Sequence, residues 1–230
     1  MNARRALLAA CLLSAALAPA ALRAHSLEEL QDQLFEREEF FQVKDEQAPG
    51  FALKDAEGRP VGLQDFRGKV VVLHFIYAGC PDVCPLHAER IAAIQEMVNV
   101  TPMKELVQFI TITTDPARDT PDVLKAYGPV HGLDPVNWMF LTSGKDRPED
   151  TTRKLAEQFG HKFAPTDDGL QIHGVVTHVI DWNGMLVANF YGLRFEPTNL
   201  VLFVNALTND PGRPHGHEQK GWLERMRDLF

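Results

Sequence analysis

Apolar runs alternate with amphipathic stretches along the middle of the chain, a pattern that predicts an α/β fold. Residues 69–77 are almost all β-branched, aromatic or otherwise apolar, as in a strand that is buried on both faces. Apolar residues recur at helical intervals over 86–98, and a second apolar strand is predicted at 107–113. The first part of the domain is therefore strand, loop, helix and strand.

A second group of elements follows. In order, these are a helix that begins at Thr120-Pro121, a strand over 138–142, a helix over 148–159, paired strands over 174–181 and 185–191, and a helix over 199–207. Asn183-Gly184 between the paired strands is a favoured hairpin turn. Together these elements predict one domain over 48–208. Its layout, a βαβ unit followed by a hairpin and a helix, is thioredoxin-like, with a central mixed sheet flanked by helices.

Residues 1–24 have the composition of a secretory signal peptide. Two arginines precede a short apolar run, and small-residue cleavage patterns follow it. The run is too short to span a membrane, and a lipoprotein-like processing box that ends at Cys11 comes too early within it. We therefore expect a periplasmic protein, exported with cleavage of the signal and without a lipid anchor.

Polar extensions flank the predicted domain. Residues 25–47 are densely acidic and carry leucines at helical spacing, which predicts a short surface helix or a mobile leader. The tail, 209–230, ends in an amphipathic segment that we expect to form a helix packed on the domain, with docking or membrane contact as the alternative. His215 and His217 in this tail could capture a metal, although short histidine pairs in tails are mostly incidental.

The net charge argues against two classes of partner. The chain has a formal charge of −8 at pH 7. Cleavage of the signal would remove three arginines and make the remaining chain more negative. Such an acidic protein does not attract nucleic acid or anionic lipid. The apolar content is also sufficient for one core that needs no disulfide.

Cys80 and Cys84, in the string CPDVCP, lie between the first strand and its helix. The unpaired N–H groups and the dipole at the start of a helix favour thiolates, which both redox chemistry and metal binding require. A structural disulfide across three residues would add little stability. Oxidoreductases of this fold typically have two residues between their cysteines, and the positions where a peroxiredoxin has Pro and Thr or Ser hold Leu73 and Tyr77.

The chain resembles the Sco/SenC family of copper-binding assembly factors for cytochrome c oxidase. The resemblance rests on four strings in matching order and spacing: YAGCPDVCP, TTDPARDTPDVLKAY, NWMFLTSG and HGVVTHVIDWNG. It covers residues 49–207 and implies a thioredoxin-like fold in which both cysteines and one distal histidine bind copper. The implied work is delivery of copper to the dinuclear copper site of the oxidase, or reduction of the cysteines of that site.

The family pattern also selects the histidine. It places the ligand eight residues before the hairpin turn, which gives His173 here, where a loop enters a strand. His178 is the alternative ligand, but a packed, hydrogen-bonded histidine is expected inside a strand. Two thiolates and one imidazole form a soft site that favours Cu(I) and accommodates Cu(II) with an added oxygen ligand. Zinc would normally take a fourth protein ligand.

Other polar residues near these motifs have simpler or secondary roles. We expect His74 to be a buried core residue, and His87 to be a surface histidine near the site. Asp115, Arg118 and Asp119 follow the strand at 107–113, and capping with an ion pair would suffice to explain them. Because their loop should lie at the same sheet end as the cysteines, we expect them to support the metal site or to dock a partner.

The sequence therefore predicts an exported copper metallochaperone rather than a turnover enzyme, with a cytochrome c oxidase subunit as the receiving partner. The alternative is a thiol-disulfide oxidoreductase that keeps the metal-site cysteines of a partner reduced. That activity would use Cys80 and Cys84 as a redox-active pair and would not need His173. A copper or redox sensor that signals through its tail or loops is a third class.

Overall fold

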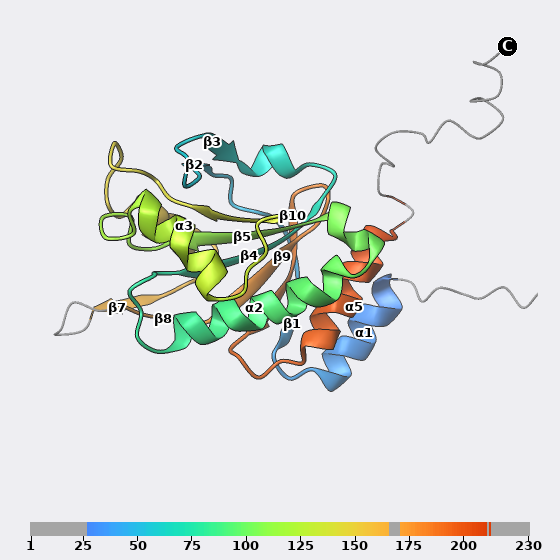
Figure 1. Cartoon of the computed structure of the whole chain (residues 1–230). Helices are drawn as coiled ribbons and strands as arrows, with labels where there is room; N and C mark the ends of the chain where they lie inside the picture. Colours follow the sequence, from blue (N-terminus) through green and yellow to red (C-terminus); the bar gives the residue numbers. More distant parts are fainter. Residues whose placement is uncertain (1–26, 166–170, 211, 213–230) are drawn as a thin grey trace, which may run out of the picture.

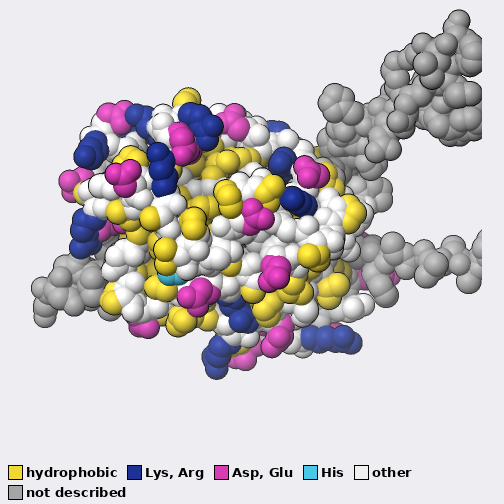
Figure 2. Space-filling view, viewed as in Figure 1, with side chains coloured by type: hydrophobic (Ala, Val, Ile, Leu, Met, Phe, Trp, Pro, Cys, Tyr) yellow, Lys and Arg dark blue, Asp and Glu magenta, His cyan; other side chains and the backbone are white. Residues whose placement is uncertain are grey.

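The computed structural model describes residues 27–165, 171–210 and 212 (Figure 1). The expected signal peptide at 1–24 and the amphipathic segment, His215 and His217 of the tail lie outside these residues. Within the described part of the chain, no helix has both the length and the apolar character needed to cross a membrane. Acidic and basic side chains are interspersed over the face shown in Figure 2.

A six-stranded mixed sheet forms the centre of the molecule, in the order β1-β10-β9-β4-β5-β6 (Figure 1). Its strands are β1 Phe41–Gln47, β4 Val70–Ile76, β5 Val107–Thr113, β6 Trp138–Leu141, β9 Val176–Ile180 and β10 Met185–Tyr191. β4, β5 and β6 are parallel, whereas β9, β10 and β1 are added in antiparallel pairs. Two hairpins lie outside this sheet, formed by β2 Ala52–Lys54 with β3 Pro60–Gly62 and by β7 Phe163–Pro165 with β8 Gln171–His173.

Helices cover both faces of the sheet. They are α1 Leu27–Arg37, α2 Val83–Asn99, α3 Pro121–Val130, α4 Thr151–Gln158 and α5 Pro197–Thr208, with short 3-10 helices at η1 Leu63–Phe66 and η2 Pro102–Glu105. Buried side chains of α1, α2, α3 and α5 join one apolar cluster, and those of α4 and η1 join the other. The sheet therefore separates two cores.

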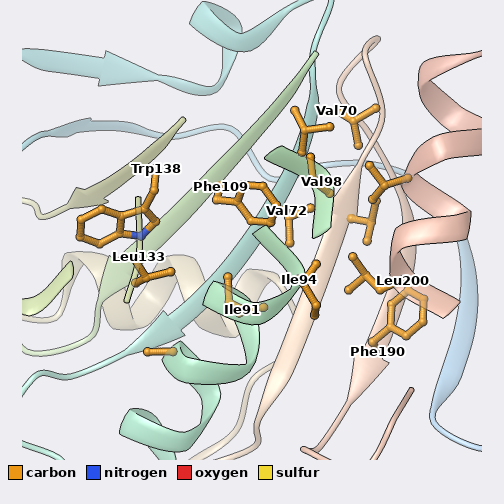
Figure 3. Close-up of a cluster of buried hydrophobic side chains, with 14 of the residues drawn as sticks. Val70, Val72, Ile91, Ile94, Val98, Phe109, Leu133, Trp138, Phe190 and Leu200 are labelled. Carbon is orange, nitrogen blue, oxygen red and sulfur yellow. The ribbon is translucent and has the colours of Figure 1, made fainter. Parts of the chain in front are cut away.

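β4 supplies side chains to both cores, as its unbroken apolar run predicts. Val70 and Val72 belong to the same cluster as Ile91, Ile94 and Val98 of α2 (Figure 3), whereas Leu73 belongs to the opposite cluster. All seven residues of β4 are buried. A strand buried on both faces cannot shift its register without exposing apolar side chains, so its end is a fixed point for the loop that follows.

The segment expected to be an extension contributes an edge strand. β1 pairs with β10, so the sheet extends beyond the predicted domain boundary at residue 48. Composition hid this strand because only Phe41 of β1 is buried and the other residues are polar or exposed, as is common at a sheet edge. The expected short helix is present as α1, although Leu34 is buried in the core. The Glu38 carboxylate accepts hydrogen bonds from the Glu196 backbone N–H at 2.9 Å and from Asn199 Nδ2 at 2.8 Å, which attaches this segment to α5.

Candidate metal centre

Cys80 lies on the loop that joins β4 to α2, and Cys84 is the second residue of α2. The Cys80 N–H donates to the Tyr77 carbonyl at 3.1 Å, so the chain turns tightly as it leaves the sheet. Both cysteines are free thiols, with exposed fractions of 8% for Cys80 and 2% for Cys84. The helix begins three residues earlier than its apolar period predicts, which places Cys84 in the first turn of α2.

The two thiols are in contact but have different environments. The Cys84 thiol donates a hydrogen bond to the Cys80 sulfur, which also accepts from the N–H groups of Asp82 and Cys84 and from the Tyr77 side chain. Burial acts to raise the pKa of Cys80, but these donors outweigh it and the pKa falls below its ordinary value. Burial, the bond to Cys80 and nearby negative charge raise the pKa of Cys84. Cys80 is therefore the more acidic thiol of the pair.

Asp119 connects the second motif to the cysteine loop. One oxygen of its carboxylate accepts from the Ala78 N–H at 3.0 Å and also from the Thr113 hydroxyl. Burial raises the pKa of Asp119, although both donors oppose the rise. The contact fixes the backbone two residues before Cys80 to the end of β5.

Asp115 and Arg118 complete this loop. They form an ion pair in which the Arg118 side chain remains 60% exposed, while Asp115 is largely buried. The Asp115 N–H donates to the Thr113 hydroxyl oxygen at 2.9 Å. The motif thus has a buried end beside the cysteine loop and a cationic end at the surface.

Sequence reasoning missed Tyr127, which contacts the start of α2 from α3. Its hydroxyl donates to the Cys84 carbonyl at 3.3 Å, and the side chain is 5% exposed. Burial and the neighbouring cysteines raise the pKa of Tyr127, so its phenol keeps the proton that it donates. Tyr127 is the last residue of the string TTDPARDTPDVLKAY, which was the available signal for its position.

The backbone of His173 ends β8, where it pairs with Phe163. The side chain of His173 lies outside what the structure describes. Three residues later the chain enters β9, in which Thr177 lies opposite His74 near the end of β4. His87 of α2 contacts Thr177, with 2.9 Å between Nε2 and Oγ1. The β7–β8 hairpin and the start of α2 accordingly lie at the same end of the molecule (Figure 1).

His178, the alternative ligand, faces the opposite core. Its ring packs against Phe75 and Phe159, with centroid distances of 6.0 and 4.9 Å, whereas both cysteines belong to the cluster on the α2 side. Its Nδ1 lies 2.7 Å from Asn189 Oδ1 and its Nε2 lies 3.0 Å from His161 Nε2. Among the described side chains, no group of three His, Cys, Asp or Glu residues is arranged to hold a metal ion.

The two remaining histidines near the site are both buried. His74 is a core residue as expected, and burial lowers its pKa to about 3. The expectation for His87 was wrong, because it is only 1% exposed and its ring centroid lies 4.7 Å from that of His74. His87 follows Cys84 by three positions, which puts both on the inner face of α2. A search for apolar periodicity overlooks a histidine at such a position.

Comparison with known proteins identifies the family. The SCO1/SenC family model matches residues 42–201, which is more than half of the chain. The chain belongs to the SCO1/SenC family. It is 31% identical over 143 residues to the SCO2-like protein RP587 of Rickettsia prowazekii, an alignment that covers 61% of this chain and 67% of that protein.

Solved structures of Sco proteins have the same fold. ScoI of Bradyrhizobium japonicum, solved with copper bound, is 28% identical with a TM-score of 0.57, covering 70% of this chain and 99% of that chain. BsSco, a member of the Sco family of cytochrome c oxidase assembly proteins, has a TM-score of 0.63 over 73% of this chain and 96% of its own. At 20% identity BsSco shows the fold alone. The thioredoxin-like fold with a central mixed sheet flanked by helices is thereby confirmed.

Proposed function

We propose that this protein is an exported copper metallochaperone of the Sco type, which binds copper through Cys80, Cys84 and His173. Its cargo would pass to the dinuclear copper site of cytochrome c oxidase in the periplasm. The observation that carries the proposal is the pair of free, contacting thiols at the start of α2, at the sheet end where β8 brings His173. Family membership and the copper-bound ScoI relative support it.

The donor chemistry suits copper as cargo. Two sulfurs and one imidazole are soft donors that favour Cu(I). The Cys84 thiol must lose its proton to become a ligand, and the positive charge of the metal offsets the burial that otherwise keeps Cys84 protonated. Copper loading therefore releases a proton and requires the reduced pair.

We favour His173 over His178 as the third ligand. To bind copper beside the cysteines, His178 would have to give up contacts at both ring nitrogens and reach the other face of the sheet. We also propose that Asp119 supports the cysteine loop, and that the exposed Arg118, held by Asp115, takes part in docking an acidic partner surface.

An anaerobic Cu(I) competition titration of the reduced mature chain tests the ligand set. Cys80→Ser and Cys84→Ser should abolish tight binding. His173→Ala should weaken binding about 100-fold, because loss of even an outer partner of a metal ligand costs about 10- to 100-fold. His178→Gln, which can keep a donor toward Asn189 and an acceptor toward His161, should bind as the native protein does, because His178 is not itself a ligand. Native affinity in His173→Ala would refute the ligand set.

The second candidate function is reduction of a disulfide on a partner, and the asymmetry of the cysteine pair favours it specifically. The Cys80 thiolate would attack the partner disulfide, forming a mixed disulfide and releasing one partner thiolate. Cys84, after its proton passes to that thiolate, would attack the Cys80 sulfur and release the second partner thiolate. The partner disulfide is reduced by two electrons, and Cys80 and Cys84 become a disulfide.

Transfer and reduction can be separated with the same variants. The substrate is the oxidised or reduced copper-site domain of the oxidase subunit, and the assay follows either its copper content or its free thiols. If His173→Ala loses copper transfer but the native protein reduces the disulfide no faster than Cys80→Ser does, the chaperone function holds. If His173→Ala reduces the partner fully and restores oxidase assembly, the reductase function replaces it.

A further inference from the structure

A buried pair of histidines closes the base of the β7–β8 hairpin. His161 lies two residues before β7, and His178 is the third residue of β9. Their Nε2 atoms are 3.0 Å apart, and the side chains are 4% and 0% exposed. The chain leaves the core at His161 and is back in the central sheet at His178, and β8 with His173 lies between these two points.

The direction of this hydrogen bond follows from its neighbours. The Tyr191 hydroxyl donates to Gln42 Oε1 at 2.6 Å and accepts from Asn189 Nδ2 at 3.2 Å. The amide oxygen of Asn189 therefore faces His178 Nδ1, which must carry the proton. A neutral imidazole has one N–H, so His178 Nε2 is an acceptor and His161 Nε2 is the donor.

The surroundings keep the His178 ring neutral and strengthen the hydrogen bond. His161 packs against Phe75 with a centroid distance of 5.1 Å, and His178 packs against Phe159 at 4.9 Å. Burial, followed by the effect of His161, lowers the pKa of His178 to about 3. In an apolar environment, breaking such a bond leaves a polar atom without a water partner, which is unfavourable.

The hairpin depends on its base for its position. Within the described residues β8 pairs with β7 alone, in a two-stranded sheet of three residues each. An isolated pair of short strands is marginally stable at best. The base is fixed at His161 by its backbone N–H, which donates to the Ala156 carbonyl at the end of α4 at 3.0 Å, and by its ring through His178.

We propose that the His161–His178 hydrogen bond positions His173 for copper, so that both histidines are positioning residues for the metal site. The inference rests on the proposed function in one respect, which is that His173 is a ligand. It assigns a purpose to two buried histidines that neither the cysteine motif nor the ligand set explains.

The test is a double-mutant cycle for Cu(I) affinity in the full mature chain. His161→Leu removes the donor, and His161→Gln keeps an N–H donor at similar reach. We expect His161→Leu to weaken binding about tenfold, as loss of an outer partner of a ligand does, and His161→Gln to recover most of that loss. In the His173→Ala background, His161→Leu should produce no further change, because the residue through which it acts is gone.

Three outcomes would overturn the inference. One is native affinity in His161→Leu, and another is an equal loss from His161→Leu with and without His173, which marks a general structural defect. Should His161→Leu not fold, the Gln variant and ¹⁵N NMR of the native rings decide, since an Nε2–H on His178 contradicts the assigned donor. Unchanged binding in His173→Ala alone would instead refute the proposed ligand set, so the two failures are distinguishable.

Discussion

The Cys84 thiol donates its hydrogen bond to the Cys80 sulfur, so the two cysteines of one motif are chemically unequal. Three other donors converge on Cys80, whereas Cys84 is more deeply buried and lies close to the charge of Cys80. The inequality comes from their places in the fold. Cys80 lies on the loop before α2, where N–H groups are free to bind it, and Cys84 lies within the first turn.

Alkylation rates should reveal this inequality. In anaerobic iodoacetamide reactions at pH 7, Cys80 in the Cys84→Ser variant should react more than about tenfold faster than Cys84 in Cys80→Ser, because one unit of pKa changes the thiolate fraction about tenfold. Mass spectrometry of timed samples gives both rates. Serine at position 84 keeps a hydroxyl donor for Cys80. Equal rates in the two variants would contradict the assignment of Cys80 as the more acidic thiol.

Oxidation of the cysteine pair should control copper binding. After treatment with a mild disulfide-forming oxidant, the native chain should bind no Cu(I) tightly, since neither sulfur is then a thiolate. Reduction should restore binding, and the proton released on loading should be measurable in weakly buffered solution. Tight binding by the oxidised chain would show that the sulfurs are not the ligands.

Asp119 should stabilise the cysteine loop through a single carboxylate oxygen. Asp119→Ala leaves the Ala78 N–H and the Thr113 hydroxyl without this acceptor and should lower the free energy of unfolding by about 1–3 kcal/mol. Asp119→Asn keeps one oxygen and should lose less. Urea denaturation measures both. A loss in Asp119→Asn as large as in Asp119→Ala would mean that charge, rather than the shared acceptor, is what matters.

Stability should decline as the pH falls below about 6.5. His74 and His178 have pKa values lowered to about 3 by burial, whereas the unfolded chain binds protons at histidine near pH 6.5. Between these two pH values the unfolded state binds more protons than the folded state. The free energy of unfolding therefore decreases as the pH decreases, by up to about 1.4 kcal/mol per pH unit for each histidine. Above pH 6.5 this contribution is fully present.

The matched control for this pH dependence is His178→Gln, which has no titrating ring at that position. Urea denaturation from pH 7.5 to 4.5 should show a slope shallower than the native one by about 1.4 kcal/mol per pH unit. Identical slopes in the two proteins would show that His178 is protonated in the folded state, contrary to its burial.

The strongest predictions from sequence concern elements with a clear period. β5 has the predicted bounds, and β4 and the Asn183-Gly184 hairpin lie where buried apolar runs and turn chemistry place them. β1 was missed because an exposed edge strand lacks a buried face. β7 and β8 have three residues each, which is too short for a period to be recognised.

The site was predictable where it follows from one element and not where it depends on contacts between distant ones. The position of both cysteines between a central strand and a helix follows from local pattern, although α2 begins early enough to include Cys84. The Asp119 bond to Ala78 spans 41 residues, and the bond between His161 and His178 crosses from the segment after α4 to β9. No spacing rule in a single sequence encodes such pairs.

The chain of hydrogen bonds that starts at His161 ends at Gln42 in β1, inside the segment that composition alone assigns to an acidic leader. Trimming the protein to the apparent globular portion would therefore leave the cysteine motif intact while removing the far anchor of this chain. Shortened versions that begin at residue 48 should be judged by whether His173 still contributes to Cu(I) binding, as well as by their solubility. In this protein β1 and the segments that flank the β7–β8 hairpin are therefore joined by one continuous chain of hydrogen bonds.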